Sequence, residues 1–308
     1  MSGNTVLKTY LFADLESLED LFQNAPVGFL LTDSAGVPVT YNRAFALLTN
    51  LPWPERLSAL EFRLLAADGG GSVNVPAMVA AETPVTDLAV SVDGSARTLL
   101  VNASAQMDGG RLAGVRWVVR PDLRQAIPSV DDDPTEYLLP TAELIGENDA
   151  LAWAARLSDS TDVRPTVRSF TTEEAVRRQR ELDNFIMYAP AAVHLIDVRG
   201  TVLSANATDL AVAGFVDEPD QFIGGDIRRV YAEQAVLEDL LGRWDSDLPT
   251  LNFRARLVNR TGAVLPVVIF SNSRFVDGEF RNTRDVVFVD PDLDTPPTRT
   301  RRFHWPHD

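Results

Sequence analysis

Few residues in this chain of 308 have types and spacing suited to chemistry. There is no cysteine, which removes disulfides, thiolate metal sites and cysteine nucleophiles and favours a reducing cytoplasm. Of the three histidines, only His194 lies inside an apolar stretch, "AAVHLIDV"; His304 and His307 lie near the end. We interpret His194 as a neutral core imidazole with a satisfied hydrogen bond, in preference to a ligand. If it titrates, it is the one internal group poised for a pH response.

Two glycine-rich stretches resemble catalytic motifs only superficially. "IGGDI" at 223–227 is similar to a diguanylate cyclase signature but lacks the following Glu-Phe, so we interpret it as a turn. Gly69-Gly70-Gly71 lacks the Lys-Ser/Thr of a phosphate-binding loop. No Ser-His-Asp set, metal-ligand cluster, phospho-acceptor histidine region or ATP-binding region is apparent. We therefore expect no enzymatic activity from this chain.

Composition and charge narrow the classes further. The net charge of −16 disfavours direct binding to nucleic acid, because an acidic surface repels phosphate backbones. No run of about 18 apolar residues occurs, so no membrane span is expected. The hydrophobic content of 45% and the length are typical of two globular domains, each with its own core.

One sequence pattern occurs twice. "NAPVGFLLTDSAGVPVTYNRAF", from Asn24, aligns with "YAPAAVHLIDVRGTVLSANATD", from Tyr188, at a constant offset of 164 residues. In each copy an Asp and a Gly suit a hairpin turn between two strands, and an Asn suits the start of the next helix. We predict that these matched residues determine the fold: Asp33, Gly36 and Asn42 in the first copy, and Asp197, Gly200 and Asn206 in the second.

The expected elements follow the same order in both copies: a helix, two strands, short helices (57–82 and 209–243) and three strands. This order predicts an α+β unit, with a five-stranded antiparallel sheet and short helices on one face. Its other face needs a cover, such as the preceding helix or a second protomer. Thr171 and Glu174 form a predicted capping box for the helix before the second copy. That helix could pack on its own sheet or form a dimeric coiled coil.

Both copies resemble PAS domains, the sensor modules common in bacterial signalling. The second is similar to the PAS type attached to sensor histidine kinases, at Ser271-Asn272, Asp277-Gly278-Glu279-Phe280 and Thr283-Arg284-Asp285. We accordingly predict these parts: an N-terminal extension (1–14), PAS-like domain 1 (15–121), a partly helical linker (122–170), PAS-like domain 2 with its preceding amphipathic helix (171–290) and a basic, aromatic tail (291–308).

The resemblance implies a cytoplasmic signal-sensing or regulatory module within histidine-kinase signalling, either complete or as the sensor part of a longer kinase. It would relay ligand or partner binding through helices and dimer contacts. The alternatives are a ligand-free protein-interaction scaffold and a sensor that binds flavin non-covalently. Expected partners are a second copy of the chain, a histidine kinase or regulator, and a small-molecule ligand.

PAS chemistry also limits the cofactors. Without cysteine, the flavin–cysteine adduct of some PAS domains is impossible, and no histidine stands where others ligate haem, so haem is not expected; the cofactor, if any, stays unidentified. The pocket candidates share an expected position inside the second copy: His194, Leu195, Phe222, Leu237, Leu240, Phe253 and Ile269.

Overall fold

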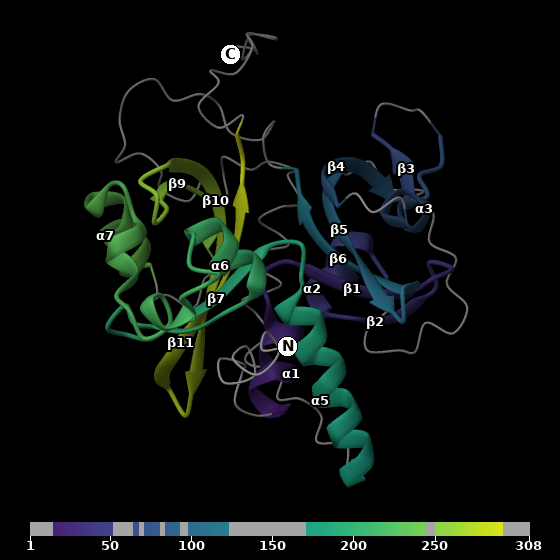
Figure 1. The fold of residues 1–308 in the computed structure, drawn as a ribbon, viewed down its shortest axis with the longest axis horizontal. Helices are drawn as coiled ribbons and strands as arrows, with labels where there is room; N and C mark the ends of the chain where they lie inside the picture. The colour runs from purple at the N-terminus through teal and green to yellow at the C-terminus, as the bar shows by residue number, and fades with distance from the viewer. Residues whose placement is uncertain are drawn as a thin grey trace, which may run out of the picture.

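The structure, a computed structural model, describes residues 15–51, 64–67, 71–80, 84–92, 98–122, 171–243 and 250–291. The predicted N-terminal extension, nearly all of the linker and the tail lie outside these ranges. Two antiparallel sheets, each with its own helices, stand side by side (Figure 1). We call the parts built on them the first unit (15–122) and the second unit (171–291).

The first unit has a six-stranded sheet in the order β2-β1-β6-β5-β4-β3. We expected five strands and only short helices over 57–82. Instead, the buried side chain of Leu64 anchors a short strand there, whose backbone pairs with the edge of β4. The elements are α1 (Leu15–Asn24), β1 (Gly28–Asp33), β2 (Pro38–Tyr41), α2 (Arg43–Thr49), β3 (Leu64–Ala66), α3 (Val75–Ala80), β4 (Val85–Val92), β5 (Thr98–Asp108) and β6 (Arg111–Pro121).

The second unit has the expected five strands, in the order β8-β7-β11-β10-β9. Its leading helix α5 carries the predicted capping box: Thr171 accepts from the backbone of Glu174, whose side chain bonds back to the Thr171 amide. The elements are α5 (Thr172–Met187), β7 (Ala192–Ile196), β8 (Val202–Ala205), α6 (Ala207–Ala213), the 3-10 turns η3 (Pro219–Gln221) and η4 (Ile227–Val230), α7 (Gln234–Gly242), β9 (Thr250–Val258), β10 (Val264–Val276) and β11 (Glu279–Val289).

The repeated turn has the same geometry in both units. Asp33 accepts hydrogen bonds from two backbone amides of its own turn, both at 2.9 Å, and Asp197 accepts two at 2.9 and 2.8 Å. Gly36 and Gly200 both have a φ of +86°, which disfavours any residue with a Cβ. The repeated motif therefore serves the hairpin that leads into the core.

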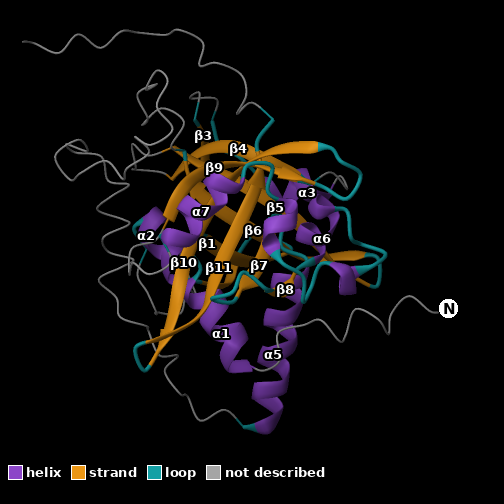
Figure 2. Cartoon of the chain, turned by 90° about the vertical axis from the view of Figure 1, so that its left-hand side faces the viewer, coloured by secondary structure: helices purple, strands orange, loops and turns teal. Residues whose placement is uncertain are grey.

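Three hydrophobic clusters occur among the described residues. One lies between the sheet and helices of each unit, and the third lies between the units. There α1 and α5 run beside each other, as Figures 1 and 2 both show, with the Phe22 and Phe185 rings edge to face at 5.2 Å. The outer face of each sheet is thus covered inside one chain. A coiled coil between two copies stays untested.

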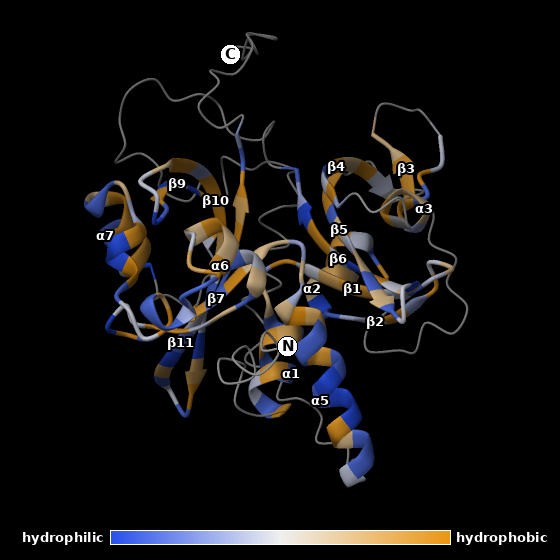
Figure 3. Cartoon of the chain, in the orientation of Figure 1, coloured by the Kyte–Doolittle hydropathy of each residue, from blue (hydrophilic) through white to orange (hydrophobic). Residues whose placement is uncertain are grey.

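Hydropathy follows this arrangement. Apolar residues concentrate on the strands, while the end of α5 that extends beyond α1 is mostly hydrophilic (Figure 3). None of the described helices is both long and apolar enough to cross a membrane.

Candidate functional site

A cluster of ionisable side chains is buried inside the second unit. His194 lies on β7, between Asp209 of α6 and Asp285 of the neighbouring strand β11. Its Nδ1 lies 3.0 Å from Asp209 Oδ2, and its Nε2 lies 3.7 Å from Asp285 Oδ2. All three residues are at most 3% exposed. Such groups are rarely buried unless they are paired.

The two carboxylates decide the charge of the imidazole. Burial alone would lower the pKa of His194. The carboxylate of Asp209, which also accepts its hydrogen bond, and the more distant Asp285 outweigh burial and raise that pKa to about 9. This raised pKa favours an imidazolium at neutral pH over the neutral imidazole that we interpreted from the sequence.

The pKa values of groups next to the imidazole are shifted as well. Burial raises the pKa of Asp285, an effect that His194 opposes. The hydroxyl of Thr283 also donates a hydrogen bond to Asp285. Burial, reinforced by the carboxylates of Asp285 and Asp209, raises the pKa of Tyr231 well above its usual value, so its phenol stays neutral. The cluster is thus a buried set of coupled ionisable groups.

Asn206 connects the cluster to α5. Its side-chain oxygen accepts from the amides of Asp209 at 2.8 Å and Val193 at 3.0 Å, which fixes the start of α6 beside β7. Its amide group donates to the carbonyls of Ile186, at the end of α5, and Ala191. Asn42 caps α2 in the first unit in the same way. A fold-determining residue thus also holds one member of the cluster in place.

The interior next to the cluster is almost filled. A cavity of about 10 Å³, lined by residues that include His194, Phe222 and Tyr231, has room for roughly one water molecule. It is far smaller than the roughly 300–1,000 Å³ of typical ligand sites. Of the other predicted pocket residues, four are buried in the same inner core without lining this cavity: Leu237, Leu240, Phe253 and Ile269.

Leu195 is a wrong prediction for the pocket. Successive residues of a strand point to opposite faces of the sheet, so Leu195 and His194 cannot both face the interior. Leu195 packs against the cluster between the units instead.

At the three positions that match this cluster, all of them described, the first unit has no charged side chain. The 164-residue offset places Leu30 and Phe45 at two of the three matching positions. The third is Trp117, because it pairs with Leu30 as Asp285 pairs with His194. All three are buried in the hydrophobic core. The same scaffold therefore encloses apolar side chains in the first unit and charged side chains in the second.

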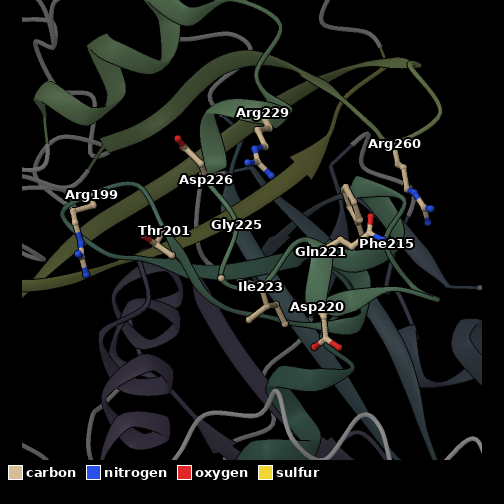
Figure 4. Close-up of a pocket in the computed structure, with 11 residues that line it drawn as sticks. Arg199, Thr201, Phe215, Asp220, Gln221, Ile223, Gly225, Asp226, Arg229 and Arg260 are labelled. Carbon is tan, nitrogen blue, oxygen red and sulfur yellow. The ribbon is translucent and has the colours of Figure 1, made fainter.

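A wide surface basin of about 910 Å³ lies on the turns of the second unit (Figure 4). The "IGGDI" stretch forms part of its wall and is a turn, as predicted. Arg199 and Arg260 stand at opposite ends and are paired with carboxylates, Arg199 with Asp197 at 3.5 Å and Arg260 with Glu218 at 2.6 Å. Asp220, Asp226 and Arg229 also line the basin, so its wall carries charges of both signs. Among the described residues, no group of three or more His, Asp or Glu could hold a metal ion.

Comparison by sequence finds no protein-family model and no curated protein that the chain matches. Comparison of structures finds PAS domains. One belongs to an HTR-like protein from Haloarcula marismortui (17% identity, TM-score 0.31, covering 37% of this chain and 99% of that one). Another belongs to a two-component sensor histidine kinase (15%, 0.30, 35% and 91%), and a third to a protein from Colwellia psychrerythraea (11%, 0.33, 37% and 97%).

These likenesses agree with the resemblance read from the sequence. At TM-scores of 0.30–0.33 they support no ligand, partner or residue role. The fold is defined here by strand order and register. It consists of α+β units with antiparallel sheets, and in this respect the chain resembles the solved PAS domains.

Proposed function

We propose that this chain is a PAS-type sensory or regulatory module whose second unit receives the signal. The observation that supports this most is the contrast between the charged cluster of the second unit and the hydrocarbon at the matching positions of the first. Buried ion pairs are weak sources of stability, and hydrophobic replacements are often neutral or better. The first unit has apolar side chains at the matching positions, so we propose that the cluster serves a purpose other than folding.

The signal, in this proposal, is a change in the protonation or hydrogen bonding of the cluster. Strand β11 supplies the relay, because neighbouring residues on a strand face opposite ways. Asp285 faces the cluster, while Arg284 faces the other unit and donates to Asp20 of α1 at 2.9 and 2.8 Å. A shift of β11 thus reaches α1 through one residue. We propose a histidine kinase or regulator in the cytoplasm as the reader of this shift, with no covalent chemistry in the chain itself.

A titration followed by NMR tests the relay. The Nε–H resonance of Arg284 should shift with the same midpoint as the ring resonances of His194. Arg116 is the matched control: it occupies the equivalent position of the first unit, next to Trp117 instead of Asp285, and should not follow that midpoint. Burial lowers the pKa of Arg116 to about 10, so the two arginines are compared up to about pH 9, where a guanidinium is still mostly protonated and a shift reports its surroundings.

The variant His194→Leu/Asp209→Ala/Asp285→Val keeps the total side-chain volume nearly constant and removes the charges. It should abolish the Arg284 titration, and the milder Asp285→Asn should reduce it. If Arg284 is silent in the folded wild-type chain while His194 titrates, the relay does not exist.

A second candidate, a ligand-free interaction scaffold, is favoured by the nearly filled interior. It predicts that the charge-free variant binds its partner as the wild type does, at every pH. A pH-dependent affinity that the variant loses would favour the sensor.

A further inference from the structure

The contacts between the two units come in equivalent pairs. Arg284 of β11 reaches across to Asp20 of α1, with both nitrogen–oxygen distances below 3 Å. In the opposite direction, Arg116 of β6 donates from Nη2 to Asn184 Oδ1 of α5 at 2.6 Å. The 164-residue offset relates Asp20 to Asn184, and the strand register relates Arg116 to Arg284. Each unit thus sends the same arginine to the helix of the other.

A second pair of contacts obeys the same relation. Ser104 Oγ of β5 donates to the Tyr188 carbonyl at the end of α5, at 3.2 Å. Asn272 Nδ2 of β10 donates to the Asn24 carbonyl at the end of α1, at 2.7 Å. Ser104 pairs with Arg116, and Asn272 pairs with Arg284, so the two donors are also equivalent. The units therefore meet across a local twofold axis, as two subunits of a dimer would.

Near this twofold axis, the two units contribute different residues at equivalent positions. Arg120 and Phe288 hold equivalent positions, each four residues after its interface arginine, and the guanidinium of Arg120 lies over the Phe288 ring, 4.6 Å from its centre. Arg120 is only 2% exposed and is paired with Asp87 at 2.8 Å. A buried cation thus meets an aromatic face, which attracts it.

We infer that these two sheet faces are interaction surfaces complementary to each other, and that neither face is complementary to a second copy of itself. If the first unit paired with another first unit, one buried Arg120 would face a second. If the second unit paired with another second unit, Arg284 would face the uncharged Asn184 and lose its carboxylate. Only the unlike pair puts Arg120 on Phe288 and Arg284 on Asp20.

The occupant of each face is the other unit of the same chain. Both units lie on one polypeptide, so their encounter is intramolecular and is favoured by a high effective concentration. A homodimer of this protein, as predicted from the sequence, would have to use a different surface.

The test begins with the full chain carrying a protease site inserted within 123–170. Before cleavage, native mass spectrometry should show no dimer that this interface holds together. After cleavage, the two halves should stay together one to one. The inference is wrong if the uncut chain exchanges units between copies to form dimers. It is equally wrong if the halves separate into pairs of identical units.

Two substitutions test the matching itself. Asp20→Asn should weaken the association of the cleaved halves by about 10- to 100-fold, because Arg284 loses a charged acceptor. Adding Asn184→Asp offers Arg116 a carboxylate at the equivalent position and should restore most of the loss. Asn184→Asp alone, in an otherwise unchanged chain, should tighten the association. If it weakens the association with or without Asp20→Asn, the faces are not matched as we infer.

Discussion

The two units differ most where their shared scaffold is most enclosed. The first unit fills the space behind its first strand with Leu30 and other apolar groups, and the second fills it with His194 and two aspartates. Turns, helix caps and strand order are nearly the same in both. The difference shows that this fold does not need charges at these positions, and our proposal of a signalling role rests on this contrast.

The comparison also explains why the charges tolerate burial. Each member has a partner: Asp209 accepts from His194, and Asp285 accepts from Thr283. The imidazolium gains the attraction of both carboxylates, which offsets its lost hydration. Removing one member is therefore more damaging than removing all of them.

The largest expected effect comes from His194→Leu, which copies the first unit at one position only. It leaves two buried carboxylates without their cation, and we expect a loss of about 3–5 kcal/mol in the free energy of unfolding. Urea denaturation at pH 7 measures it. The charge-free triple variant is the control and should stay within about 2 kcal/mol of the wild type. If His194→Leu leaves the free energy of unfolding unchanged, the two carboxylates do not depend on the charge of His194.

The next effect is a dependence of stability on pH. The folded pKa of His194, about 9, exceeds its ordinary value of 6.5, so the folded state holds this proton more tightly. The stabilisation is complete below about pH 6.5 and is lost as the pH rises through 9, a fall of about 3 kcal/mol. The raised pKa of Asp285 acts in the same direction at lower pH. The triple variant should lose this slope, and a wild-type stability that is flat from pH 6.5 to 9 would argue against a charged cluster.

The helix caps offer a more even comparison. Asn206→Ala should cost about 2 kcal/mol, because it leaves buried amides and carbonyls of β7, α6 and α5 without partners. Asn42→Ala should cost nearly as much, since Asn42 makes three such bonds. Only Asn206→Ala should also move the pKa of His194, because it alone releases Asp209. If His194 titrates with the same midpoint in both variants, the cap formed by Asn206 does not influence the cluster.

The smallest expected effect concerns the hairpin turns. Gly200→Ala and Gly36→Ala both place a Cβ at a φ of +86° and should each cost about 1–2 kcal/mol. The added Cβ would also meet Arg228 Nη1 at 2.7 Å in the second unit and Pro76 Cγ at 3.1 Å in the first. Thermal unfolding should show similar losses. A difference above about 2 kcal/mol would mean that the turns are not equivalent.

Much of the fold is readable from sequence, because local chemistry specifies it. The Asp and Gly turns, the Asn caps and the Thr171 capping box each act within a few residues of their own position. The strand β3 was missed because its three residues follow no extended pattern and owe their pairing to the edge of β4.

The site was harder to predict. No spacing in the sequence marks Asp209 and Asp285 as partners of His194. The register of β7 and β11 brings Asp285 to it, and the start of α6 brings Asp209. The repeat held one usable signal: aligned at the same offset, a His and an Asp replace two apolar residues. The third position required knowledge of strand pairing, which no spacing in the sequence reveals.

The most direct test of the central claim is the pKa of His194 in the chain of 308 residues, measured from the ring resonances by NMR. We predict an imidazolium at pH 7 and a midpoint near pH 9, with Nδ1–H donating to Asp209. A midpoint at or below the ordinary value of 6.5 would mean that the second unit encloses a neutral histidine and no charged cluster.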